Sequence, residues 1–304
     1  MSQIDHPMTM AKPARASTSR ILGSLIQDRP ALAACAFLIL LAFSATLGAA
    51  LMAPQATGVN MAMRNAAPQL GEGFAYLLGG DNLGRSVLAR LVTGARTTLG
   101  IATAAVLCSL TIGATLGLFV GLRQGLMSDI IMRLTDVIMS FPALLTALIV
   151  LYLLGPSPVN LVIVLAITRI PVYLRTVRAE VLELRRRPFV NAARAMGASE
   201  GWITRHHLLP LVAPTLLTIA SVDFAAVIIA ESGLSFLGLG IQPPNFTWGA
   251  MVAAGRPYIA QAWWVTFFPG LAIMLTTLSL TLLSNWLRLV TDPNQRWRFT
   301  RSEG

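Results

Sequence analysis

Long apolar stretches that are almost free of charge are the feature that most limits how this chain can fold. Six of them recur along its 304 residues, at positions 31–52, 97–122, 134–154, 159–174, 211–229 and 263–289. An α-helix that crosses the hydrocarbon core of a bilayer needs about 20 apolar residues. Only 12% of the residues are charged, against about 25% in soluble globular proteins. The sequence therefore predicts an all-α polytopic membrane protein with six transmembrane helices.

The first apolar stretch has two interpretations. Small residues at Gly48-Ala49-Ala50 resemble the cleavage site of a secretory signal peptide. The apolar region of a signal peptide is only about 7–15 residues long, however, and the stretch 31–52 is longer. We expect an uncleaved membrane span.

The distribution of basic residues predicts how the chain is oriented. One face would carry the N-terminal tail, the loops after the second and fourth spans, and the C-terminal end, and it collects 17 of the 23 Lys and Arg residues. Such an excess marks the cytoplasmic side, so both termini are expected inside. The expected segments are a cytoplasmic tail at 1–30, a first span with an extracytoplasmic loop at 31–96, a helical core at 97–290 and a cytoplasmic tail at 291–304.

Lys12, the net charge and the two adjacent histidines bear on three other possibilities: a nucleotide site, nucleic-acid binding and a metal site. Lys12 is the only lysine, and it lacks the G-x-x-x-x-G-K-S/T context that cradles nucleotide phosphates. The net charge of +10 could suggest nucleic acid, but basic loops also orient membrane proteins. We therefore expect membrane lipid, and no nucleic acid, as a partner. His206 and His207 would point about 100° apart on a helix, so we predict no metal site.

Within the second apolar stretch, small residues recur at every fourth position: Ala105, Ser109, Gly113, Gly117 and Gly121. Residues at i and i+4 share one face of a helix. Small faces allow helices to approach closely in lipid. The pattern predicts a packing face inside the bundle, with a homodimer contact as the weaker alternative.

The loop between the fourth and fifth spans is unusually polar and basic. Its segment from Asn191 to Ser199 is rich in Ala and contains Arg194, residue types that favour helix, and Gly197 suits a helix end. We expect an exposed helix–Gly–helix element at about 188–210, with Asn191 as a cap. The small side chains would leave a face that fits a groove on another protein. The candidate docking residues of this run are Asn191, Ala192, Ala193, Gly197, Ala198 and Ser199.

This loop resembles the "EAA" loop of permease subunits of bacterial ABC importers, whose pattern is E-A-A, three residues, G, nine residues, I-x-L-P. Here Asn191-Ala192-Ala193 is followed by Gly197 and then by His207-Leu208-Leu209-Pro210 at the expected spacing. The sequence departs from the pattern at Asn191, where the family has Glu, and at His207, where it has Ile.

Two further blocks resemble the C-type permeases of dipeptide, oligopeptide and nickel importers. The first is similar to L-G-T-D-x-x-G-R-D-x-x-S-R…G-A-R and contributes Gly79, Asp81, Gly84, Arg85, Arg90 and Arg96. The second, from Glu231 to Gly240 and on to Trp248-Gly249, is similar to E-x-x-L-S-F-L-G-L-G…Q-P-P…W-G. Together with the loop, the resemblance covers about residues 20–293.

The resemblance implies the transmembrane domain of a type I ABC importer in the bacterial inner membrane. Its function would be to translocate short peptides, or a related small solute such as a nickel chelate. The implied partners are a homologous B-type permease, two cytoplasmic ATPases and an extracytoplasmic binding protein. ATP and Mg²⁺ would bind to the ATPases, so this chain would have no catalytic residue and no cofactor of its own. The loop at 188–210 would couple the ATPases to the spans, and the resemblance adds Leu209 and Pro210 to its docking residues.

Two functions from other classes are weaker. A membrane-embedded enzyme would need a catalytic grouping, and the spans hold no paired carboxylates, HExxH or Ser/His/Asp set. A self-sufficient secondary transporter usually has more than six spans and inverted repeats, which the sequence does not show.

Ionisable residues in the fifth span are candidates for the pathway or its gate, because charge at membrane depth is costly. Asp223 either lines the pathway or pairs with Arg169. Glu231, with Ser235 nearby, either has a pathway role or lies solvated at the outer interface, where it caps a helix end. The glycines and prolines at 233–244 suggest a broken, re-entrant backbone, which is tolerated only where it is buried or faces water.

Overall fold

The computed structural model of the chain describes residues 18–69, 71 and 73–291, and within them the regular structure is helical apart from one isolated bridge between Gly80 and Ser86. The α-helices of this part are α1 Thr18–Gln27, α2 Arg29–Phe43, α3 Ala49–Thr57, α4 Val87–Leu122, α5 Leu126–Ser140, α6 Ala143–Leu154, α7 Pro158–Leu184, α8 Pro188–Ala195, α9 Glu200–Ile203, α10 Leu209–Phe236, α11 Trp248–Gly255 and α12 Trp264–Thr291. Positions 1–17 and 292–304, which make up most of the two predicted tails, lie outside the described residues.

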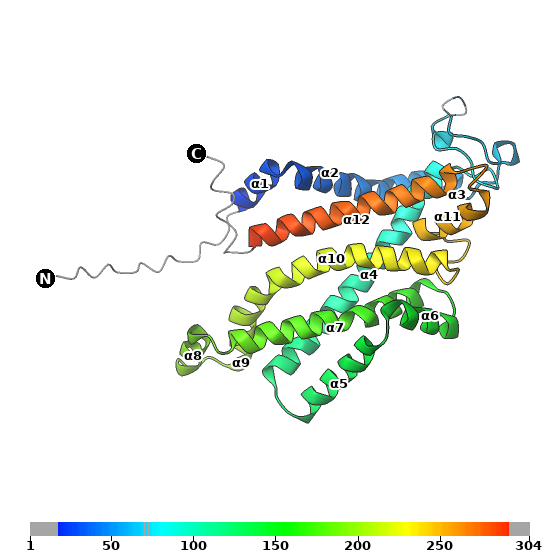
Figure 1. Cartoon of the computed structure of the whole chain (residues 1–304). Helices are drawn as coiled ribbons and strands as arrows, with labels where there is room; N and C mark the ends of the chain where they lie inside the picture. The colour runs from blue at the N-terminus through cyan, green and yellow to red at the C-terminus, as the bar shows by residue number, and fades with distance from the viewer. Residues whose placement is uncertain (1–17, 70, 72, 292–304) are drawn as a thin grey trace.

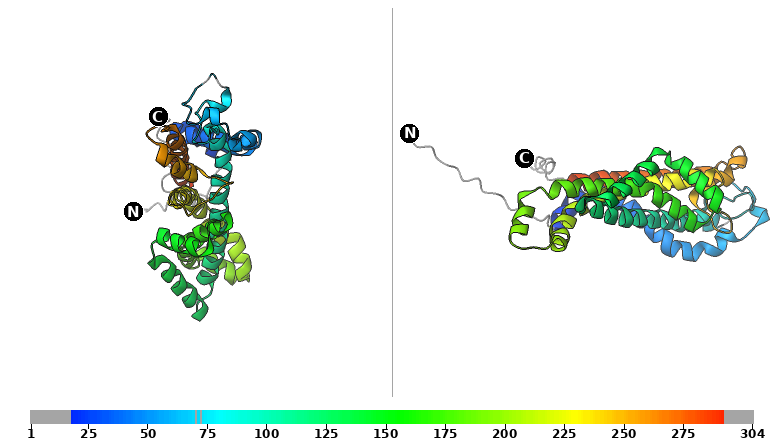
Figure 2. Two further views of the ribbon diagram at one scale, coloured as in Figure 1. Left: turned by 90° about the vertical axis from the view of Figure 1, so that its right-hand side faces the viewer. Right: turned by 90° about the horizontal axis from the view of Figure 1, so that it is seen from below.

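The helices form an elongated bundle that α4 crosses obliquely (Figures 1 and 2). Helices α8 and α9 lie at one end of the bundle, which we call the loop end (Figure 1). Helix α1 and the last turns of α12 also lie toward the loop end. Helices α3 and α11 lie at the opposite end. The first and last described helices therefore approach the same end of the bundle, as an even number of spans requires.

Five helical segments of the described chain are long and apolar enough to cross a bilayer: Arg29–Thr57, Val87–Leu122, Pro158–Leu184, Glu200–Phe236 and Trp264–Val290. A sixth span exists only if α5 and α6 count as one, and these two helices meet at an angle of 91°. The continuous helix predicted at 134–154 is therefore wrong. The break between α5 and α6 lies at Phe141-Pro142, because the residue before a proline disfavours helical backbone.

Several spans are longer than their apolar stretches. Helix α4 begins at Val87 because Ser86 caps it, its Oγ accepting the Ala89 backbone N–H at 3.0 Å. Arg90 and Arg96, predicted in an extracytoplasmic loop, therefore lie within α4. Helix α7 likewise continues to Leu184, beyond 174, because helix-forming residues such as Arg, Glu and Leu extend it past the apolar stretch.

The small face of α4 packs against α7, which confirms the predicted packing face. A Cβ added at Gly113 would lie 2.6 Å from the Cβ of Tyr173, and one added at Gly117 would lie 2.7 Å from the carbonyl oxygen of Leu174. At Gly121 the added Cβ would lie 2.9 Å from a methyl carbon of Val181. These distances leave no room for a side chain, so the glycines set the separation of the two helices.

Candidate functional site

The loop end carries the predicted helix–Gly–helix element. Helix α8 is followed by Gly197 at φ +87° and then by α9, so the predicted turn at Gly197 is confirmed. Arg194 Nε donates to Glu200 Oε1 at 2.6 Å and links the two helices. The predicted cap at Asn191 is wrong, because Asn191 lies inside α8, which begins after Arg187.

One side of this loop is packed into its own chain. Val190 and Ala193 of α8 and Ile203 of α9 are buried in a single apolar cluster. The same cluster contains residues of α7 and of the segment leading into α10: Val177, Val181, Leu208 and Val212. Ala193 therefore faces this chain, and the prediction that it fits a groove on another protein is wrong.

The other side of the loop is exposed and carries three large apolar side chains among polar ones. Met196 is 82% exposed, and Phe189 and Trp202 are also exposed. His206 stacks on Trp202 with ring centroids 4.7 Å apart, and His207 contacts the edges of Trp202 and Phe189. Among the described residues no group of three or more His, Cys, Asp or Glu could hold a metal ion.

The remaining docking candidates lie around this exposed side. Asn191, Ala192 and Ser199 are exposed, and Ala198 is half-buried. Leu209 and Pro210 form the exposed first turn of α10, and both lie on cavity walls. Ser199 Oγ also accepts the Trp202 backbone N–H at 3.3 Å and so caps α9.

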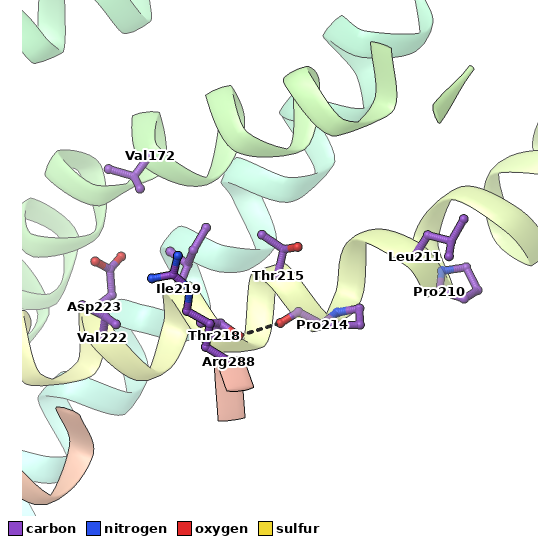
Figure 3. Close-up of a pocket in the computed structure, with 10 residues that line it drawn as sticks. All are labelled: Val172, Pro210, Leu211, Pro214, Thr215, Thr218, Ile219, Val222, Asp223 and Arg288. Carbon is purple, nitrogen blue, oxygen red and sulfur yellow. Dashed lines mark hydrogen bonds between the residues drawn. The ribbon is translucent and has the colours of Figure 1, made fainter. Parts of the chain in front are cut away.

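Asp223 makes the predicted pair with Arg169 and also borders a groove. Its carboxylate pairs with the guanidinium of Arg169 on α7. It also lies on the wall of a groove of about 780 Å³ along α10 (Figure 3). The groove is lined by Val172, Pro210, Leu211, Pro214, Thr215, Thr218, Ile219, Val222, Asp223 and Arg288.

The Arg169–Asp223 pair is not fully satisfied by hydrogen bonds. The side chain of Asp223 is only 5% exposed and that of Arg169 is 29% exposed. Arg169 Nε is buried without a hydrogen-bond partner among the described residues, and the Tyr173 hydroxyl lies close to the Asp223 carboxylate and to Ser109. Buried polar atoms of this kind are costly, so the pair is a weak point of the fold at the groove.

At the opposite end, the first signature block folds into a tight turn around Asp81. Asp81 Oδ1 accepts the backbone N–H groups of Leu83 and Arg85, each at 2.9 Å. Its Oδ2 accepts Arg85 Nε at 2.7 Å and lies 3.7 Å from Arg90 Nε. Gly84 adopts φ +70°, and a Cβ there would lie 1.6 Å from the Asn60 carbonyl oxygen, so only glycine fits.

Two other residues of this block have different surroundings. Gly79 adopts φ +84° and lies under the Trp264 indole, whose Nε1 donates to the Gly80 carbonyl at 3.1 Å. Arg96 is exposed and lies six residues, nearly two turns, further along α4 than Arg90. The block therefore brings together all of its candidate residues except Arg96.

The second signature block contains a buried carboxylate. Glu231 is 1% exposed, and its Oε1 accepts the Ser235 hydroxyl at 2.6 Å. Ser235 Oγ lies 3.3 Å from Thr247 Oγ1, which also caps α11. The alternative with Glu231 solvated at an interface is therefore wrong. The backbone remains helical through Gly233 to Phe236, and it turns only at Gly238, with φ +85°.

A cavity of about 420 Å³ joins the two signature blocks, and we call it the signature pocket. Its walls include Arg85, Arg90, Ser235, Gln242 and Phe246. The Arg90 guanidinium lies over the Phe246 ring, 4.3 Å from its centroid. Sequence reasoning missed Phe246 and Thr247. The signal was available, because both lie between the Q-P-P and W-G parts of the second block.

Comparison with known proteins identifies the family. Residues 113–297, more than half of the chain, match the family described as binding-protein-dependent transport system inner membrane component. The chain belongs to this family. The permease is thus a multi-pass protein of the bacterial inner membrane and a subunit of an ABC importer.

Curated relatives match most of the permease. The di/tripeptide transport system permease protein DppC of Pseudomonas aeruginosa is 41% identical over 218 residues, 72% of each chain. The glutathione transport system permease protein GsiD of Pectobacterium atrosepticum is 40% identical over 223 residues, 73% of this chain and 74% of that protein. A putative peptide transport system permease protein of Brucella suis is 39% identical over 241 residues, 79% of each chain.

A solved structure supports the fold. A chain of the methionine ABC transporter MetNI, in an inward-facing conformation, matches with a TM-score of 0.54 at 20% identity. The match covers 66% of the permease and 96% of that chain. The permease therefore has the transmembrane fold of a type I ABC importer.

Proposed function

We propose that the permease forms, with a homologous B-type permease, the pathway of an ATP-driven importer of short peptides. The relatives named above are described as di/tripeptide, glutathione and peptide permeases, which supports a peptide or a related small solute. An extracytoplasmic binding protein would deliver the substrate. A nickel chelate is the second candidate solute, and transport assays with both would separate them.

The observation that carries this proposal is the two-sided loop formed by α8 and α9. Its inner side is packed onto α7 and α10, and its outer side exposes Phe189, Met196 and Trp202. An exposed apolar surface on an otherwise polar loop is typical of a protein–protein contact. In this proposal the surface docks on a cytoplasmic ATPase, and closure of the ATPase dimer moves the helices.

The orientation follows from the same proposal. With the loop on the ATPase side, both termini are cytoplasmic and the signature pocket is extracytoplasmic. A reporter that is active only in the periplasm is expected to be active when fused after Gln69 or Gln261. The same reporter fused after Arg187 is expected to be silent. The reverse pattern would exclude this orientation.

ATP hydrolysis is assigned to separate chains, where ATP and Mg²⁺ bind, and the permease itself is not an enzyme. The purified permease is expected to show no ATPase activity above background. Co-expression with its ATPases, the partner permease and the binding protein is expected to give a complex with ATPase activity and peptide uptake. ATP hydrolysis by the permease alone would contradict the proposal.

Asp223, Glu231 and Ser235 have distinct places in this function. Asp223 would line the pathway, because it lies on the wall of the groove along α10. Ser235 would lie where solute enters, on the wall of the signature pocket. Glu231 would act through Ser235, because its Oε1 accepts the Ser235 hydroxyl and its side chain is buried.

A further inference from the structure

The signature pocket has the size and polarity of a small-molecule site. Its volume of about 420 Å³ lies within the range of roughly 300–1,000 Å³ that is usual for ligand pockets. Polar walls come from Arg85, Arg90, Gln242 and Asn245, and an apolar wall comes from Phe246. This volume exceeds that of a single side chain, which favours a small molecule of several linked groups over a lone ion.

Among the described residues, the walls of the pocket carry two guanidinium groups, of Arg85 and Arg90, and no carboxylate. The two nearby carboxylates lie behind the walls, Asp81 paired with the arginines and Glu231 behind Ser235. Both oxygens of Asp81 are already engaged, one by backbone N–H groups and one by the two guanidiniums. The Arg90 side chain is only 10% exposed. A buried cation that is not fully compensated favours binding of an additional anion.

The orientation of the two arginines points to the kind of anion. Arg85 and Arg90 both approach Asp81 through Nε. No described residue accepts a hydrogen bond from their terminal nitrogens at this site. These nitrogens are paired donors in a planar fork, which matches a carboxylate. The other nearby carboxylate, of Glu231, accepts the hydroxyl of Ser235 and does not pair with either arginine.

We propose that the signature pocket binds the C-terminal carboxylate of a peptide as it enters the pathway. The carboxylate lies against Arg85 and Arg90, and the peptide body packs against Phe246, over whose ring the Arg90 guanidinium lies. This proposal rests on the proposed function in peptide import. It adds selection for a free C-terminus by the permease itself.

The test uses the complete transporter, with its ATPases and partner permease, in nanodiscs without binding protein. Saturation-transfer NMR compares dialanine with dialanine amide, which lacks the C-terminal charge. The wild-type complex is expected to prefer dialanine by about tenfold or more, the effect of one charge-assisted hydrogen bond. Arg85→Gln is expected to remove this preference, and Arg85→Lys to retain part of it. Arg64→Gln is the matched control, because Arg64 is exposed at the same end and does not line the pocket.

A second pair of variants leaves both arginines intact. Ala254→Trp places an indole at the pocket wall and is expected to reduce dialanine binding, whereas Ala260→Trp, exposed outside the pocket, is not. Thermal unfolding of each complex shows whether it is folded. Equal binding of dialanine and its amide by the folded wild type would overturn the proposal.

Uptake assays with binding protein distinguish the remaining outcomes. If the wild type shows no ATP-driven peptide uptake, the proposed function itself fails. If uptake occurs and Arg85→Gln lowers only the affinity for the binding protein, the pocket receives an acidic group of that protein. That result would overturn the peptide proposal while leaving the proposed function intact.

Discussion

The close contact of α4 with α7 allows a sharp prediction at Gly117. In Gly117→Ala, the added methyl carbon would lie 2.7 Å from the Leu174 carbonyl oxygen and 2.8 Å from the Val177 Cβ. Comfortable carbon contacts are about 3.5–4.0 Å, so the helices would have to separate locally by roughly 1 Å. Forcing extra volume into a packed interface costs about 1–3 kcal/mol.

A matched control on the same helix isolates this steric cost. Gly100 also lies inside α4, but a Cβ added there meets nothing within 4 Å. Both Gly→Ala exchanges gain about 1 kcal/mol of helix propensity. Gly100→Ala is therefore expected to stabilise the permease slightly. The difference in unfolding free energy between the two variants is expected to be about 1–3 kcal/mol, with Gly117→Ala the less stable.

The assay is equilibrium unfolding of the purified permease in mixed micelles, followed by helical circular dichroism. Expression and membrane insertion are measured for both variants, because a poorly inserted chain would distort the comparison. If the unfolding free energies of the two variants differ by less than about 0.5 kcal/mol, Gly117 behaves like an exposed position and the packing argument is refuted.

Three further predictions concern the groove and the loop. Arg169→Met and Asp223→Leu each leave one charge unpaired and are expected to lower the free energy of unfolding by about 3 kcal/mol. The double variant is expected to recover most of this loss. Additive effects of the two substitutions in thermal unfolding would contradict this. Gly197→Ala is expected to cost about 1–2 kcal/mol of strain at φ +87° and to reduce uptake. Gly201 has equally open surroundings and no positive φ, so Gly201→Ala is expected to transport normally. Equal uptake by the two variants would exclude a role for the turn. Ala193→Trp is expected to lower the amount of folded protein, because Ala193 is buried in its own chain; normal abundance and thermal stability would place Ala193 on the outer face instead.

Periodicity and local backbone chemistry explain what the sequence predicted correctly. The four-residue repeat of small side chains in α4 depends only on helix geometry, so the packing face followed without knowledge of its partner. Gly197 was recognisable because a helix end often needs positive φ, which glycine adopts at little cost. The five continuous spans followed from the length of the apolar stretches.

Tertiary contacts explain what the sequence did not predict. Small size made Ala193 suitable for any close contact, and hydropathy could not distinguish its own chain from a partner. One of the two alternatives for Glu231 was an interface position, because an isolated carboxylate prefers water, but the hydroxyl of Ser235 satisfies it inside the bundle. The bend at Phe141-Pro142 was visible in the sequence, yet a hydropathy window averages across it.

The packing of the loop determines how a force applied to it would travel. Its inner side shares one buried cluster with Val177 and Val181 of α7 and with Val212 of α10. Close-packed side chains transmit displacement because they have little free volume to absorb it. The same two helices carry Arg169 and Asp223, whose ion pair lies at the groove. A push on the loop would therefore displace α7 and α10 at their contact.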